Sequence, residues 1–188
     1  MTGKDIADIR KTLAEEPVLP LSKLSWEVAE IYRCKYATPA ERIFMSLNAA
    51  STAWHIHEWI WKTTDEAGRR ELSRVTGAAG EGFRHFVIAV QKWSGAIGIC
   101  RQLATAHKHF AINHDRPDVY YEVHHDPMLE EHGTSVTICS NGQSHQDFDV
   151  YMAALVSWGK MYVHLGYPSA EAVLQSAPDY FSPSRVDR

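Results

Sequence analysis

The sequence predicts a mainly α-helical fold, a bundle of about five to six helices with a small antiparallel β-hairpin or meander inserted before the last helix. Apolar residues recur every three to four positions through most of the chain, as in an amphipathic helix. Between about residues 118 and 147 this spacing gives way to short runs rich in β-branched and aromatic residues. No repeat or break in composition marks a second domain, so we expect residues 1–188 to form a single helical domain with a loosely held tail over 177–188.

The first half of the chain predicts four helices. Their expected ranges are about 2–16, 22–36, 38–63 and 65–75. Pro17 and Pro20 are expected to break the chain after the first helix, and Ser22 to cap the second. The charged fourth helix is followed by a glycine-rich loop around Gly80.

The start of the third helix carries the clearest local signal. Thr38 is an N-cap residue, Pro39 occupies the first helical position, and Glu41 can close a reciprocal capping box. The rest of this helix is very apolar. Its buried face is expected to carry Ile43, Leu47, Ala50, Trp54 and Trp61.

The second half predicts two helices, a small sheet and a last helix. The helices are expected over 83–93 and 96–110, with Ser94-Gly95 as a hinge between them or a kink in one longer helix. Strands are expected over 119–124, 136–140 and 143–146, the last two joined by an Asn141-Gly142 turn. The last helix, over 149–165, repeats apolar residues at three and four, namely Tyr151, Ala154, Leu155, Trp158, Met161, Tyr162 and Leu165.

Composition and charge limit the classes of function. A formal charge of −4 and a pI near 6.2 argue against a protein wrapped in nucleic acid, although a local basic cleft is compatible with them. Cys34, Cys100 and Cys139 are far apart and lack metal-binding spacing, which favours buried reduced thiols. The charged N-terminus does not resemble a signal peptide, and no apolar run is long enough to span a bilayer. We therefore expect a cytoplasmic protein without membrane contact.

Several motifs of familiar enzymes are absent from the sequence. It contains no P-loop, no GxGxxG after a strand, no GxSxG and no HExxH. Most nucleotide-binding, hydrolase and zinc-protease functions are thereby excluded.

The first candidate site lies on the third predicted helix. His55 and Glu58 are three residues apart and thus neighbours on a helix, and Asn48, Ser51 and Lys62 extend their polar stripe. This stripe either faces water or faces an internal cavity, where His55 and Glu58 would bind a transition metal. A metal-binding helical-bundle enzyme would then complete the site with His107 or His109. His57, on the apolar side, is expected to be a core or boundary histidine.

The second candidate site lies near the end of the helix over 96–110. Arg101, Thr105 and Lys108 form one stripe, whereas Leu103 and Phe110 point towards the core. Cations at this position either complement the helix dipole or hold an anionic substrate beside a histidine suited to proton transfer.

Arg101-Gln102, followed after four residues by His107, resembles the R-x4-6-H motif of HEPN-type helical domains. Those domains are compact helical bundles, and many that retain the motif are metal-independent endoribonucleases of toxin or defence systems, often with a site formed across a homodimer. The resemblance implies that Arg101 stabilises charge on the phosphate and that His107 acts as acid or base, with His109 as the alternative histidine for this role. Lys108, Gln102 and His109 would contact the RNA, and no cofactor would be needed. The family usually has Asn, Asp or His where this chain has Gln102.

A third hypothesis is a non-catalytic interaction protein, because six tryptophans and eight tyrosines could form an aromatic partner surface.

Two further polar segments belong to none of these three hypotheses. The loop over 124–132 could bind a metal or form a solvated hairpin tip. Arg84-His85 and His164 have no partner that the sequence identifies.

Overall fold

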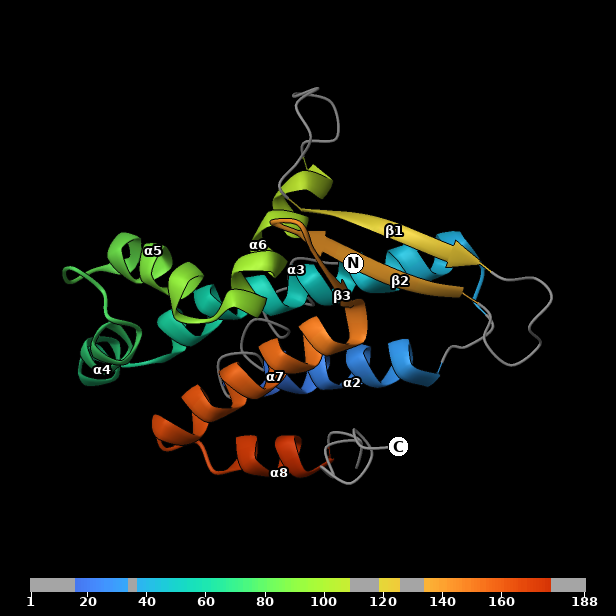
Figure 1. Ribbon diagram of the computed structural model, residues 1–188. Coiled ribbons are helices and arrows are strands. Elements are labelled where there is room, and N and C mark those ends of the chain that lie inside the picture. Colours follow the sequence, from blue (N-terminus) through green and yellow to red (C-terminus); the bar gives the residue numbers. More distant parts are fainter. Residues whose placement is uncertain (1–15, 34–36, 109–118, 126–133, 177–188) are drawn as a thin grey trace, which may run out of the picture.

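The computed structural model describes residues 16–33, 37–108, 119–125 and 134–176 (Figure 1). Its elements are α2 (Leu19–Arg33), α3 (Pro39–Thr63), α4 (Glu66–Thr76), α5 (Phe83–Trp93), α6 (Gly95–Lys108), β1 (Val119–His125), β2 (Thr134–Ser140), β3 (Gln143–Gln146), α7 (Asp147–His164) and α8 (Ser169–Ser176). The predicted mainly α-helical class is confirmed, with seven helices and one antiparallel sheet among the described residues. The predicted helix over 2–16 and the tail over 177–188 lie outside them.

The helix α3 is at the centre of the fold. It packs against α2, α6 and α7, and its first half lies beneath the sheet. The helices α4 and α5 lie at the other end of α3, and α8 packs against α7 (Figure 1). This arrangement brings α6 and the start of α7 to the same side of the sheet as α3.

The hydrophobic core is centred where α2, α3, α6 and α7 meet, and it extends to α4 and α5. Its largest fully buried side chains include Trp158, Tyr151, Tyr162, Phe86 and Leu21. Trp158 is 0% exposed, as predicted, and its indole Nε1 donates a hydrogen bond of 2.8 Å to the carbonyl of Ala53. Burial of the ring and pairing of its only polar atom together join α7 to α3.

The capping box at the start of α3 is confirmed. The Thr38 amide donates to the Glu41 carboxylate at 2.8 Å, and the Glu41 amide donates to the Thr38 hydroxyl at 3.3 Å. The helix continues to Thr63, where the sequence predicts its end. These are contacts within one turn, which explains why the sequence alone predicts them.

The buried face of α3 was predicted only in part. Of the five apolar residues expected there, Ala50 is fully buried, and Trp54 and Trp61 are partly exposed but pack against the core. Ile43 and Leu47 are partly exposed. The buried residues are Arg42, Ser46, Ala49, Ala50, Ala53, Ile56, His57 and Ile60. Half of these residues are Ser or Ala, because several helices pack closely against α3, and both tryptophans lie at the edges of those contacts.

Two helix boundaries also differ from the prediction. Ser22 is not a cap, because α2 begins at Leu19 and the Ser22 hydroxyl bonds back to the Val18 carbonyl at 3.4 Å. Pro20 lies in the first turn of α2, where backbone N–H groups have no partner within the helix, so proline is tolerated there.

The helix α8 was not predicted at all. It packs against α7 at Gly159, where an added Cβ would come within 2.4 Å of Leu174.

The sheet follows the predicted order β1-β2-β3, with every neighbouring pair antiparallel. Asn141 has φ 51° and Gly142 has φ 75°, so both turn residues adopt the left-handed conformation that a type I′ hairpin needs. Ser94 has extended backbone, so α5 and α6 are two helices separated by a break. The predicted turn and third strand are therefore confirmed, and the break at Ser94 excludes a kink within one longer helix.

Candidate functional site

Arg101 of the HEPN-like motif is exposed on α6, and its guanidinium carbon lies 6.0 Å from the ring centre of Trp54 on α3. The two candidate segments therefore lie on helices that pack directly against each other. Leu103 is buried, as predicted, and Gln102 is partly buried. The side chains of His107 and Lys108, and the whole of His109 and Phe110, lie outside the described residues.

The backbone of α6 relates positions 101 and 107. Six residues of α-helix correspond to a rotation that leaves the two positions about 120° apart around the axis. Position 107 lies two helical turns after Cys100 and therefore on the same face of α6 as this residue, whose side chain is fully buried. A phosphate that contacts both Arg101 and His107 must therefore reach two faces of α6, or contact residues from two copies of the chain.

The polar stripe of His55 and Glu58 runs along the surface of α3. His55 Nδ1 lies 2.8 Å from the Ser51 carbonyl, and Glu58 accepts a hydrogen bond of 3.3 Å from Lys62. Burial acts to raise the pKa of Glu58, but the hydrogen bond and charge of Lys62 outweigh it and leave the pKa below its usual value. Within the described ranges, no group of three or more His, Cys, Asp or Glu side chains is placed to hold a metal ion.

His57 is a core histidine, as predicted. It is 3% exposed, its Nδ1 lies 2.5 Å from the Trp54 carbonyl, and burial lowers its pKa. Its ring stacks on Phe83 at 5.7 Å and lies 4.1 Å from Trp54. These contacts and the lowered pKa favour a neutral imidazole whose main role is packing.

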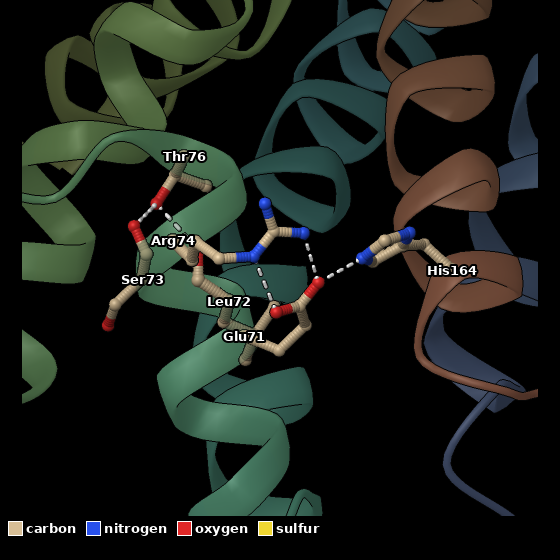
Figure 2. Close-up of polar contacts among 6 residues, drawn as sticks. All are labelled: Glu71, Leu72, Ser73, Arg74, Thr76 and His164. Carbon is tan, nitrogen blue, oxygen red and sulfur yellow. Dashed lines mark hydrogen bonds and ion pairs between the residues drawn. The ribbon is translucent and has the colours of Figure 1, made fainter.

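A cluster that the sequence did not predict joins α4 to the end of α7 (Figure 2). Glu71 accepts two hydrogen bonds from Arg74, at 2.7 Å from Nε and 2.5 Å from Nη2, and another from His164 Nε2. The Arg74 hydrogen bonds, followed by that of His164, lower the pKa of Glu71 to about 2. The sequence could have indicated the pair of Glu71 and Arg74, because they are three residues apart on one helix. No sequence pattern relates either residue to the distant His164.

A second unpredicted cluster is buried beneath the sheet. Arg42 Nη2 contacts the Asp147 carboxylate at 2.9 Å, and Arg42 Nη1 donates to the Ile31 carbonyl at 2.8 Å. Beside them the Tyr151 hydroxyl lies 2.7 Å from that of Ser46 and 3.1 Å from that of Tyr121. Burial raises the pKa of Asp147 to about 6, against the opposing effect of Arg42. The cluster joins α2, α3, α7 and β1.

A cleft of about 500 Å³ opens between α6, the β2–β3 turn and the start of α7. Its lining consists of Gln91, Gly95, Ala96, Gly98, Ile99, Gln102, Ser140, Asn141, Gln143, His145, Asp149, Val150 and Ala153. Gln102 is the one predicted site residue among them. Sequence patterns could not have found this cleft, because its walls come from segments about 50 residues apart that only the tertiary fold brings together.

Comparison with known proteins yields no match to any protein-family model, curated protein or solved structure. None of the helices in the described residues combines the length and apolar character needed to cross a membrane.

Proposed function

We propose that the protein is a metal-independent, HEPN-like endoribonuclease of toxin or defence type, in which Arg101 binds the scissile phosphate and His107 transfers a proton. The observation that carries this proposal is the exposure of Arg101 on a helix packed in a compact bundle, with its guanidinium beside Trp54. A cation close to an aromatic ring loses little orientational freedom when it binds a phosphate.

The reaction needs only groups of the RNA and of the chain. The ribose 2′-oxygen attacks the adjacent phosphorus, its proton passes to a base, and the bond to the 5′-oxygen breaks as that oxygen receives a proton. The products are a 2′,3′-cyclic phosphate and a 5′-hydroxyl. His107 would perform one of the two proton transfers, and Arg101 would stabilise the charge that develops on the phosphate oxygens.

The separation of positions 101 and 107 around α6 favours a site shared between two copies. A homodimer would place Arg101 of one copy opposite His107 of the other, as the HEPN resemblance implies. Mixing Arg101→Ala with His107→Ala should then restore about a quarter of wild-type activity, because half the dimers are mixed and each has one complete site. Activity that stays at the level of the separate variants would place both residues in one copy or outside the site.

Cleavage of an RNA panel in the presence of a chelator tests the reaction directly. The wild type should generate ends with 2′,3′-cyclic phosphate, and His107→Ala should lose about a hundred- to ten-thousand-fold of the rate. His85→Ala is the matched control, since His85 is an exposed histidine on α5. Equal cleavage by the wild type and His107→Ala, or cleavage by neither, would refute the proposal.

A second candidate is an interaction protein with an aromatic surface. It is favoured by Trp26 on α2 and Phe44 on α3, each 62% exposed. If this surface mediates self-association, Trp26→Ser should lower the molar mass in solution while the fold persists. An unchanged mass would remove this surface from consideration as a self-association interface.

The metal-binding alternative retains His55 and Glu58 as its two ligands on α3, with Glu58 already paired to Lys62. Elemental analysis of the purified protein decides it. A stoichiometric transition metal that is lost in His55→Ala would support a metal enzyme in place of the nuclease, and metal-free protein without thermal stabilisation by Zn, Mn or Fe(II) would eliminate it.

A further inference from the structure

The cleft beside α6 has the dimensions of a small-molecule site. Its volume of about 500 Å³ lies within the range typical of ligand pockets. Small residues in the lining, including Gly95, Gly98 and Ala153, leave the space open. Gly98 is also needed for the close approach of α5 and α6, because an added Cβ would lie 2.8 Å from the Gln91 carbonyl oxygen.

The polar side chains of the cleft are mainly neutral. Four carboxamides line it, from Gln91, Gln102, Asn141 and Gln143, together with Ser140, His145 and Asp149. No lysine or arginine occurs among the described residues that line it, so the lining has no permanent cation that would favour a phosphate. Carboxamides both donate and accept hydrogen bonds, which suits an uncharged ligand with donors and acceptors along one edge.

Apolar lining residues indicate the shape of that ligand. Ile99 and Val150 present aliphatic groups from α6 and α7, next to the carboxamides. A planar ring can cover such groups with its faces while its edge meets the polar side chains. Nucleobases combine a planar ring with an edge of hydrogen-bond donors and acceptors, and amide side chains are common partners of these edges.

One of the carboxamides is held in place by the fold, and the backbone of another is fixed by a turn. The left-handed conformation of Asn141 and Gly142 sets where the Asn141 side chain leaves the backbone. The Gln91 amide donates a hydrogen bond of 3.0 Å to the Val87 carbonyl, which fixes its orientation at the end of α5. Groups that are already ordered lose less entropy when they bind a ligand.

We propose that this cleft binds an uncharged nucleobase of the RNA strand whose phosphate contacts Arg101. Gln102 lines the cleft and directly follows Arg101, so the two side chains leave adjacent sides of α6. One strand can thus place a phosphate at Arg101 and a neighbouring base in the cleft. Asp149 can only accept hydrogen bonds when ionised, which favours bases with an exocyclic amino group over uracil. The inference rests on the proposed function for the strand, but the binding of a free nucleoside does not require cleavage.

Titration of full-length His107→Ala protein with free nucleosides, followed by NMR chemical shifts up to millimolar concentrations, tests this inference. Adenosine, cytidine and guanosine should bind more tightly than uridine, whereas ribose and inorganic phosphate should not bind in the cleft. Gln143→Ala should weaken nucleoside binding about fivefold to tenfold, the loss typical of one hydrogen bond. Gln146→Ala is the matched control, because Gln146 is also exposed on β3 but does not line the cleft. Asp149→Asn should reduce the preference over uridine.

The outcomes separate this inference from the proposed nuclease activity. Cleavage by the wild type without nucleoside binding would overturn the cleft assignment alone. Nucleoside binding without any cleavage would refute the nuclease and leave the cleft as a nucleoside site. Equal weakening by Gln143→Ala and Gln146→Ala, or binding of ribose as tight as that of nucleosides, would also overturn the cleft assignment.

Discussion

Each end of α7 contacts another helix through a carboxylate paired with an arginine or a histidine. One of these contacts is buried and the other is exposed to solvent. At the first end Asp147 pairs with Arg42 of α3, and the two side chains are 1% and 8% exposed. At the last end His164 meets Glu71 of α4, and these side chains are 44% and 32% exposed. The chemistry of the two contacts is similar, but their access to water differs.

The pKa values of the two carboxyl groups move in opposite directions. Burial raises the pKa of Asp147 to about 6, because removal from water disfavours the charged form more than Arg42 favours it. Hydrogen bonds from Arg74 and His164 lower the pKa of Glu71 to about 2, because little burial opposes them. In these two contacts, solvent access therefore decides whether the pKa of a carboxyl group with a cationic neighbour ends above or below its usual value.

The largest expected effect is the loss of Arg42. Arg42→Ala leaves the Asp147 carboxylate buried without its cation, so the free energy of unfolding at pH 7 should fall by about 3–5 kcal/mol. Denaturant titration measures this, with Arg84→Ala, an exposed arginine on α5, as the control. The loss should shrink as the pH falls below 6, because a neutral Asp147 needs no cation. A loss equal to that of Arg84→Ala would contradict the assigned role of this pair.

The pH dependence of stability isolates Asp147. Its raised pKa means that the folded state favours the neutral acid, so its contribution is fully present below about pH 4 and is lost as the pH rises through about 6. The change should be about 2–3 kcal/mol. Asp147→Asn should remove this dependence when the free energy of unfolding is compared from pH 4 to pH 7. An identical pH profile for wild type and variant would show that Asp147 does not titrate in this window.

A smaller effect is expected from the hydroxyl chain beside this pair. Tyr151→Phe removes the hydroxyl that links Ser46 to Tyr121, and it should cost about 1–2 kcal/mol of unfolding free energy. Thermal denaturation of Tyr151→Phe with and without Ser46→Ala measures the coupling. Additive losses would show that the two hydroxyls do not act together.

The smallest effect is expected at the exposed end of α7. Glu71→Gln should change the melting temperature only slightly, because solvent and salt screen this contact. Since the pKa of Glu71 is lowered, its contribution is present above about pH 4.5 and is lost as the pH falls towards 2. Melting curves at low and high salt test this. A loss as large as that of Arg42→Ala would mean that exposure does not separate the two ends of α7.

The elements that the sequence predicted correctly are those stabilised by near neighbours. The Thr38 capping box and the Asn141-Gly142 turn each involve four residues or fewer, so their residue types are sufficient to identify them. The apolar period of α7 predicted a buried Trp158, because one wide face of that helix lies against the core. The proposed role of Arg101 rests on spacing within one helix and stays a prediction, because spacing does not indicate which residues lie near it in the fold.

Contacts between distant segments could not be predicted from the sequence. The salt bridge from Arg42 to Asp147 spans 105 residues, and the contact from Glu71 to His164 spans 93. The buried face of α3 was predicted only in part because size and closeness of packing, more than apolar character, decide which residues are covered when several helices surround one. The cleft beside Gln102 likewise exists only because the β2–β3 turn packs near α6.

The sequence by itself determined the helical class, most helix ends, the hairpin and the segments that carry candidate chemistry, because these depend on interactions within a few residues. Only the tertiary structure decided which polar groups are buried, which carboxyl group has a raised pKa, and which side chains share a cleft. The physical reason is that desolvation and long-range pairing depend on what packs around a residue, and distant parts of the chain supply those neighbours.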